Sequence, residues 1–176
     1  MDKLKKAIRG IRDFPKKGIV FRDITPVLAD PVLLREAVER LAEPFCDERV
    51  DIVCGAEARG FLFGPAVAVQ LAAGFVPIRK KGKLPSATFQ ATYDLEYGTD
   101  TLEMHRDAIR PGARVLMLDD LLATGGTMKA CCDMVKAAGG TVVACAFLVE
   151  LSFLRGRDKL APHPTFALVD YASEEE

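Results

Sequence analysis

One stretch of this chain, residues 114–129 with the sequence RVLMLDDLLATGGTMK, constrains its fold more than any other. It opens with the apolar run Val115–Leu118, a pattern typical of a strand buried on both faces of a parallel sheet. Asp119 and Asp120 follow where we expect this strand to end, and a helical pattern begins near Met128. Because open α/β sheets bind ligands outside the carboxyl ends of their strands, the intervening turn is a candidate binding site.

The turn has the composition of a phosphate-binding loop. Gly125 and Gly126 allow a sharp bend that brings bare N–H groups close to a ligand. The start of the following helix adds unpaired N–H groups and partial positive charge, and Thr124 and Thr127 add hydroxyl donors. An ordinary helix N-terminus is the alternative, but the preceding acid pair and buried strand favour a phosphate site over it. We therefore expect the turn from Ala123 to Thr127 to bind phosphate.

The acid pair has a different expected ligand. Asp119 and Asp120 cannot bind phosphate themselves, since like charges repel. Paired carboxylates suit a ribose diol, a divalent cation with its waters, or positive charge that develops on a sugar ring. A site for a phosphorylated sugar is therefore predicted at this strand end.

Composition excludes several classes of protein. A length of 176 residues suits a single domain, residues 1–176, with a substantial core. The chain has 24 Lys and Arg against 25 Asp and Glu, so we expect neither nucleic acid nor a membrane as a partner. No apolar run has the length of a membrane span. Five cysteines without metal-ligand spacing indicate a reducing, cytoplasmic environment.

Strand-like and helix-like segments alternate, which predicts an α/β fold with a central parallel sheet flanked by helices. The expected buried strands are residues 51–55, 75–78, 115–118, 141–149 and 166–169.

The segments between and around these strands have their own patterns. The expected helices are residues 2–12, a helix that begins at Asp30 and Pro31 and is closed by Pro44, residues 61–73 and residues 128–138. We expect residues 18–26 and 155–159 to form loops and the acidic tail, residues 173–176, to be frayed.

Further cations are expected at the same edge of the sheet. Arg59 lies in a glycine-containing turn after strand 51–55, beside the predicted phosphate loop, although a plain surface arginine is the alternative. Strand 75–78 leads into Arg79, Lys80 and Lys83, which suit a second anionic group, although a charge run alone is more often a solvated loop. Residues 86–105 alternate as in a two-stranded antiparallel flap, an element that commonly excludes water from a phosphate site.

Taken together, these motifs resemble the type I phosphoribosyltransferases. The run DDLLATGGT is similar to their signature for binding 5-phosphoribosyl 1-pyrophosphate (PRPP). The segments DFPKKGIVFRDITPVL, GAEARGFLFGP, IRKKGKLP and YDLEYG then occur in the order found in the adenine phosphoribosyltransferases, so the resemblance covers essentially the whole chain. It implies the type I phosphoribosyltransferase fold, with a small N-terminal hood (about residues 1–30) and an antiparallel flexible flap (about residues 80–106).

The resemblance also implies an activity and its partners. The reaction converts adenine and PRPP into AMP and pyrophosphate in purine salvage, with Mg²⁺ as cofactor and a homodimer as the active form. The magnesium ion is implied to be held by PRPP and water, with the acid pair nearby.

The implied roles can be assigned residue by residue. The catalytic positions are Glu96 on the flap, Arg59, Asp119 and Asp120. The positions implied to bind PRPP are Arg59, Arg79, Lys80, Lys83, Asp119, Asp120, Ala123, Thr124, Gly125, Gly126 and Thr127. The positions implied to bind adenine are Val20, Phe21, Arg22 and Leu151, with main-chain groups of Val20 and Arg22 reading the base edge.

Two other functions remain open at this point. A transferase for a 6-oxopurine base usually provides a lysine donor to O6, whereas the relevant strand here ends in Glu150 and Leu151. A non-catalytic PRPP-sensing regulator commonly carries a DNA-binding domain, for which no residues remain in this chain.

Overall fold

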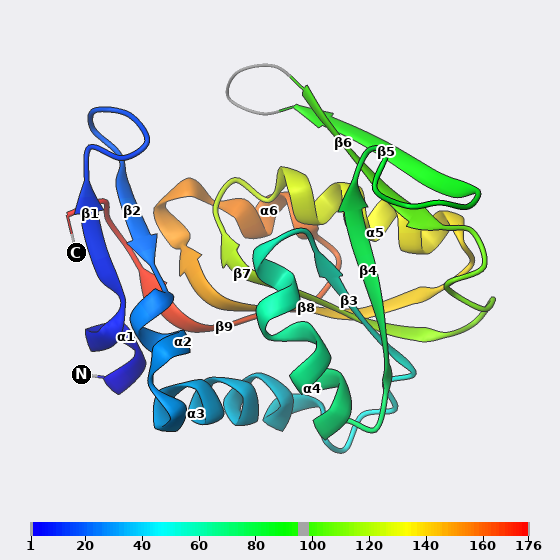
Figure 1. Cartoon of the computed structure of the whole chain (residues 1–176), viewed down its shortest axis with the longest axis horizontal. Helices are drawn as coiled ribbons and strands as arrows, with labels where there is room; N and C mark the ends of the chain where they lie inside the picture. Colours follow the sequence, from blue (N-terminus) through cyan, green and yellow to red (C-terminus); the bar gives the residue numbers. More distant parts are fainter. Residues whose placement is uncertain (1, 95–98, 176) are drawn as a thin grey trace.

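A seven-stranded sheet organises the fold (Figure 1). Its strands are β3 (Ile52–Ala56), β4 (Gly74–Lys80), β5 (Thr88–Asp94), β6 (Thr99–His105), β7 (Arg114–Leu122), β8 (Thr141–Leu151) and β9 (Thr165–Tyr171). Their order is β5-β6-β4-β3-β7-β8-β9. Strands β4, β3, β7, β8 and β9 are parallel, and β6 and β5 extend the sheet in antiparallel pairing. The predicted parallel α/β sheet is confirmed in this computed structural model, which describes residues 2–94 and 99–175.

Strand β7 lies inside the sheet and is buried on both faces, as its apolar run predicts. Alternate side chains point into two separate cores. Leu116 and Leu118 pack in one core, and Val115 and Met117 pack in the other. Each of these four side chains is at most 1% exposed.

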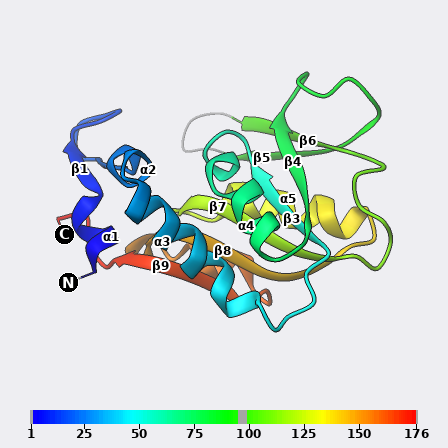
Figure 2. The same ribbon diagram turned by 60° about the horizontal axis from the view of Figure 1, so that its bottom comes forward.

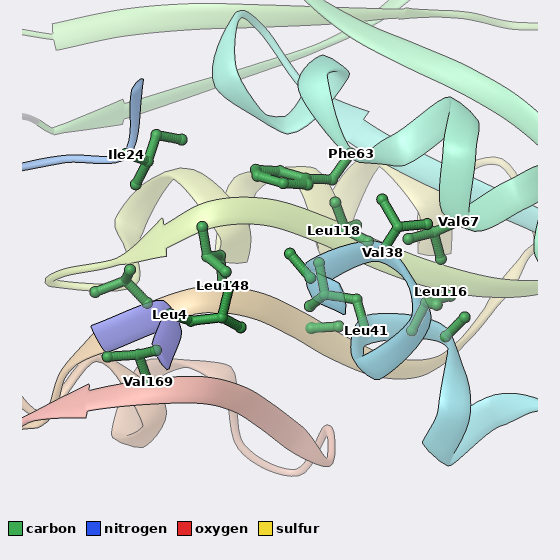
Figure 3. Packing of buried hydrophobic residues seen from close by; sticks show 14 of the residues in the cluster. Leu4, Ile24, Val38, Leu41, Phe63, Val67, Leu116, Leu118, Leu148 and Val169 are labelled. Carbon is green, nitrogen blue, oxygen red and sulfur yellow. The ribbon is translucent and has the colours of Figure 1, made fainter. Parts of the chain in front are cut away.

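Helices cover both faces of the sheet. Helices α3 (Pro31–Ala42) and α4 (Gly64–Gln70) lie on the same side as Leu116 and Leu118 (Figures 1 and 2). Figure 3 shows Val38, Leu41 and Val67 of these helices packed over the strands. Helix α5 (Gly126–Ala137) packs on the opposite core. No helix in the described ranges combines the length and apolarity needed to cross a membrane.

Helix α3 begins as its sequence predicts. The Asp30 carboxylate accepts hydrogen bonds from the N–H groups of Val32 (2.8 Å) and Leu33 (3.1 Å), and Pro31 occupies the first helical position. This arrangement satisfies two donors that a helix start otherwise leaves unpaired.

The N-terminal region differs from the sequence prediction. Helix α1 spans only Lys3–Ala7, and β1 (Arg9–Arg12) follows, so the predicted helix over residues 2–12 is wrong in its second half. The predicted loop over residues 18–26 contains β2 (Val20–Asp23) and the start of α2 (Thr25–Ala29). The physical reason is cross-strand pairing between β1 and β2, which also removes the penalty of placing Gly10 inside a helix.

Other segments also differ from the prediction. Strand β7 continues through Asp119 and Asp120 to Leu122, because it stays paired with β8 up to Glu150. The expected helix 61–73 divides into a 3₁₀ turn, Arg59–Leu62, and α4. Most of the expected loop 155–159 is instead a helix, α6 (Gly156–Leu160), which comes after a 3₁₀ turn, Ser152–Leu154. Helix α6 buries Leu160 in the core.

The C-terminal tail, which we expected to be frayed, is bonded over its described part. The Glu174 carboxylate accepts a hydrogen bond from Val20 N–H.

The expected antiparallel pair is confirmed. Strands β5 and β6 pair from Thr88 with His105 to Asp94 with Thr99. Glu96, assigned a catalytic role on the flap, lies outside the described residues.

Candidate active site

A cavity of about 360 Å³ lies at the carboxyl ends of β3, β4 and β7. Most of the predicted PRPP-binding residues line it, namely Arg59, Lys80, Asp119, Asp120, Ala123, Thr124, Gly125, Gly126 and Thr127. Tyr93 of β5 and Asp100 of β6 complete the wall on the flap side. Arg79, Lys83 and the four predicted adenine-binding residues do not line this cavity.

The turn before α5 has the geometry of an anion site. Gly125 is the N-cap residue of α5 and adopts a left-handed conformation (φ +78°) that other residues rarely take. It makes no side-chain capping bond, and the first turn of α5 holds no acidic residue. Among the described residues, the first N–H groups and the partial positive charge of this 12-residue helix therefore lie at the cavity with no capping side chain and no acid of the first turn beside them.

Gly156 at the start of α6 supports this turn from behind, a role that the sequence analysis missed. A Cβ atom on Gly156 would lie 2.3 Å from the carbonyl oxygen of Ala123, and one on Gly125 would lie 2.5 Å from the carbonyl oxygen of Gly156. The two backbones can approach so closely only because both residues are glycine. No local pattern pairs positions so far apart in the sequence.

The acid pair lies beside the turn, with Asp120 buried and Asp119 half-buried. Asp119 Oδ1 accepts a hydrogen bond from the N–H group of Asp120 (2.9 Å), and Arg59 Nε lies 3.1 Å from Asp120 Oδ2. Burial and the neighbouring carboxylate raise the pKa of Asp119 well above its ordinary value. Burial also raises the pKa of Asp120, although Arg59 acts in the opposite direction. Two desolvated carboxylates side by side favour a ligand that brings positive charge.

Gly60 allows the turn that carries Arg59 to approach this pair. A Cβ atom on Gly60 would lie 2.9 Å from the carbonyl oxygen of Leu118 and 3.2 Å from Asp119 Oδ1. A larger residue would therefore separate the turn from β7. The adjacent Glu57–Ala58 peptide bond is cis.

Of the predicted cations at the end of β4, Lys80 lines the cavity, and Arg79 and Lys83 do not. The Glu57 carboxylate accepts hydrogen bonds from Lys80 N–H (2.9 Å) and Arg79 Nε (3.2 Å), and the Lys80 main-chain bond contributes most to lowering its pKa. Arg79 is thus directed toward Glu57, while Lys80 Nζ lies 3.4 Å from Asp100 Oδ2 at the flap wall. The role of Glu57 was also missed, because a charge pattern does not show which acid reaches a basic strand end.

Phe21 brings the hood into contact with the site. The Arg59 guanidinium lies 5.4 Å from the centre of the Phe21 ring, a cation–π contact, and Phe14 packs edge-on against the same ring at 5.2 Å. Since side chains alternate along a strand, Val20 and Arg22 point to the opposite face of β2. Leu151 ends β8, where it pairs with Tyr171 of β9.

Comparison with known proteins agrees with this geometry. Residues 30–165 match the family model described as the phosphoribosyl transferase domain. An adenine phosphoribosyltransferase of Clostridium perfringens strain SM101 is 56% identical over 168 residues, which cover 96% of this chain and 98% of that protein.

Solved structures are similar over the same length. The adenine phosphoribosyltransferase of Thermoanaerobacter pseudethanolicus has a TM-score of 0.93 at 50% identity and covers 96% of this chain and 98% of its own. The Saccharomyces cerevisiae enzyme, crystallised with an imino-altritol bisphosphate and adenine, has a TM-score of 0.89 at 40% identity, covering 94% and 96%. The chain therefore belongs to the phosphoribosyltransferase family, and within it to the adenine phosphoribosyltransferases.

Proposed function

We propose that this chain transfers the 5-phosphoribosyl group of PRPP to adenine, forming AMP and pyrophosphate in purine salvage. The observation that carries the proposal is one cavity in which the half-buried Asp119 and the buried Asp120 lie beside a helix N-terminus that has no side-chain cap. These two features match the two parts of a phosphorylated ribose, and the names of close relatives support adenine as the base.

The chemistry assigns a task to each part of the cavity. The turn from Ala123 to Thr127 binds the 5′-phosphate, which fixes the sugar against β7. A ring nitrogen of adenine bonds to the anomeric carbon while that carbon loses its bond to pyrophosphate, and the proton on the reacting nitrogen passes to the carboxylate of Glu96, the residue assigned to proton transfer. Positive charge develops on the ribose during this step, and Asp119 and Asp120 stabilise it. Arg59 and Lys80 stabilise the negative charge that accumulates on pyrophosphate.

The acid pair also fits a magnesium ion shared with PRPP. The described residues contain no cluster of three or more His, Cys, Asp and Glu side chains that could hold a metal alone. Asp120 Oδ2 is buried and accepts no hydrogen bond from the described residues, although Arg59 is near it. Mg²⁺ typically combines one or two carboxylates with water and substrate phosphates, so PRPP and water would hold it near Asp119 and Asp120. When bound, the ion supplies charge stabilisation for the departing pyrophosphate.

We also propose a domain organisation and a location for this chain. Residues 1–176 form one phosphoribosyltransferase domain, with residues 1–30 as the hood and residues 80–106 as the flap. A cytoplasmic location is supported by the free cysteines, of which Cys54, Cys131, Cys132 and Cys145 are buried thiols.

A product assay tests the proposed activity. Purified protein given adenine, PRPP and Mg²⁺ should form AMP and pyrophosphate in equal amounts. A PRPP-sensing regulator would bind PRPP and form neither product, so binding of PRPP without turnover would contradict the proposal.

Replacing Phe21 tests how the base is recognised. We propose that the Phe21 ring stacks on adenine and that main-chain groups of β2 read its edge. Phe21→Ala should therefore weaken adenine binding by about 1–3 kcal/mol, the range for lost base stacking. The preference for adenine over hypoxanthine should survive, because the main chain is unchanged. The ratio of kcat/KM for the two bases measures this, and a switch toward hypoxanthine would mean that a side chain reads the base.

We also propose a homodimer in which the loop from Arg79 to Lys83 completes the neighbouring active site through Arg79 and Lys83, while Lys80 lines the cavity of its own chain. Arg79 does not line the cavity of its own chain, which supports this assignment. Mixing Arg79→Ala protein with Asp120→Asn protein should restore part of the activity, because some dimers then contain one intact site. Activity is measured after subunit exchange has been demonstrated, and absence of rescue would contradict a shared site.

A further inference from the structure

The C-terminal tail, residues 172–175, contacts the strand of the hood that we propose to read adenine. Figure 1 shows the end of the chain beside β1 and β2, far in the sequence but adjacent in space. The Glu174 carboxylate accepts a hydrogen bond from Val20 N–H. Arg22 Nη2 donates to the carbonyl oxygens of Glu174 (3.0 Å) and Ser173 (3.5 Å). The tail therefore bonds to both ends of the Val20–Arg22 segment.

The contact with Val20 identifies the edge of β2 that the tail occupies. Peptide groups of successive residues in a strand point to opposite edges. The Ile19 carbonyl accepts a hydrogen bond from Phe14 N–H across the hairpin (3.3 Å), so Ile19 and Phe21 direct their main-chain groups toward β1. Val20 and Arg22 then direct theirs away from β1, and Glu174 bonds to that edge. The same edge carries the Val20 carbonyl, an acceptor that suits the N6 amino group of adenine. It also carries the Arg22 N–H, a donor that suits the acceptor N1.

The side chain of Arg22 adds a second connection between the tail region and β2. Its guanidinium lies 3.9 Å from the centre of the Tyr171 ring, at the end of β9, and Arg22 is only 5% exposed. Tyr171 itself is 3% exposed and pairs with Leu151. A stacked and buried guanidinium has little freedom, so the main chain of Arg22 is held in a fixed position relative to the sheet.

We propose that the C-terminal tail is a latch that fixes the base-reading edge of β2, with Glu174 as its positioning residue. This inference rests on the proposed function, because it assumes that β2 reads adenine. Without the tail, β2 keeps its pairing with β1 and the stacking of Arg22 on Tyr171 but loses the bonds to Glu174 and Ser173, so its Val20 end must be ordered when the base binds. The cost of that ordering reduces adenine affinity and leaves the PRPP-binding turn, which lies on β7 and α5, unaffected.

Variants of the tail test the latch in the full enzyme. A chain that ends at Tyr171 and a Glu174→Ala variant should each raise the KM for adenine by about tenfold, the factor for one lost charge-assisted hydrogen bond. The KM for PRPP and kcat should stay at the values of the unmodified protein. Glu174→Gln keeps an acceptor for Val20 N–H and should restore most of the adenine affinity. Glu175→Ala is the matched control, since Glu175 is an exposed acid of the same tail.

The outcomes separate the latch from the proposed function. If the unmodified protein makes no AMP, the proposed function fails. If Phe21→Ala weakens adenine binding but both Glu174→Ala and the shortened chain keep the original KM for adenine, only the latch is wrong. Equal increases in the KM for adenine and PRPP would also contradict it, because they indicate a general loss of structure. A Glu174→Gln variant as weak as Glu174→Ala would contradict the role of the hydrogen bond to Val20.

Discussion

Asp119→Asn and Asp120→Asn should each lower turnover by about 10²-fold or more, the scale for losing an electrostatic partner of a developing charge. Both substitutions keep the size of the side chain and remove its charge. The ribose carries more positive charge in the transition state than in bound PRPP, so kcat should fall more than PRPP affinity. Steady-state kinetics at saturating adenine measure both quantities.

Thermal stability distinguishes this role from a structural one. The pKa of Asp119 is raised in the folded protein, so ionising this carboxyl costs stability. Below its ordinary pKa of 3.8 the group is protonated in both states and has no effect, and the cost grows as the pH rises through that value. Asp119→Asn should therefore raise the melting temperature at pH 7 and have no such effect at very low pH. Near-normal turnover with a lowered melting temperature would mean that the acids are structural.

Gly125→Ala should lower kcat/KM for PRPP by about 10²-fold, the scale of a misplacement of about 1 Å. The new methyl group would meet the carbonyl oxygen of Gly156 at 2.5 Å, and the residue would also be strained at φ +78°. Gly156→Ala should have a similar effect although Gly156 is outside the cavity lining, because its methyl group would meet the carbonyl oxygen of Ala123 at 2.3 Å.

Gly112→Ala is the matched control for these variants. Gly112 has the same φ of +78° as Gly125, and a Cβ atom there meets nothing within 4 Å. It should lose stability through backbone strain of about 1–2 kcal/mol and keep its kcat/KM for PRPP. Equal kinetic losses in Gly112→Ala and Gly125→Ala would show that strain alone, not contact with α6, accounts for the effect.

The sequence predicts the central sheet well because its signals are local. The apolar run of β7 and the Asp30 cap of α3 act within a few residues, and both appear as expected. The secondary structure of residues 2–12 and 18–26 was mispredicted because β1 and β2 exist through pairing with each other. Helical periodicity in residues 2–12 is real, but long-range pairing overrides it from Arg9 onward.

In the candidate site too, features set by contiguous residues were predicted, and features set by long-range contacts were not. The turn from Ala123 to Thr127 and the acid pair line one cavity, as the contiguous motif predicts. Glu57 and Gly156 were missed because each acts on a segment distant in the sequence, Glu57 on Arg79 and Gly156 on Ala123. The tail was misjudged for a similar reason, since its acidic composition gives no sign of a partner in β2.

Competition between bases tests the central claim most directly. Purified protein with Mg²⁺ and limiting PRPP is given adenine, hypoxanthine, guanine and xanthine in equal amounts, and the nucleotides formed are identified by mass spectrometry. A 6-oxopurine reverses the pattern of adenine, with an acceptor at O6 and a donor at N1. A site that hydrogen-bonds the adenine edge rejects this reversed pattern by about 10⁴-fold or more, so AMP should be the only nucleotide detected. Formation of IMP, GMP or XMP in amounts comparable to AMP would contradict an adenine-specific transferase.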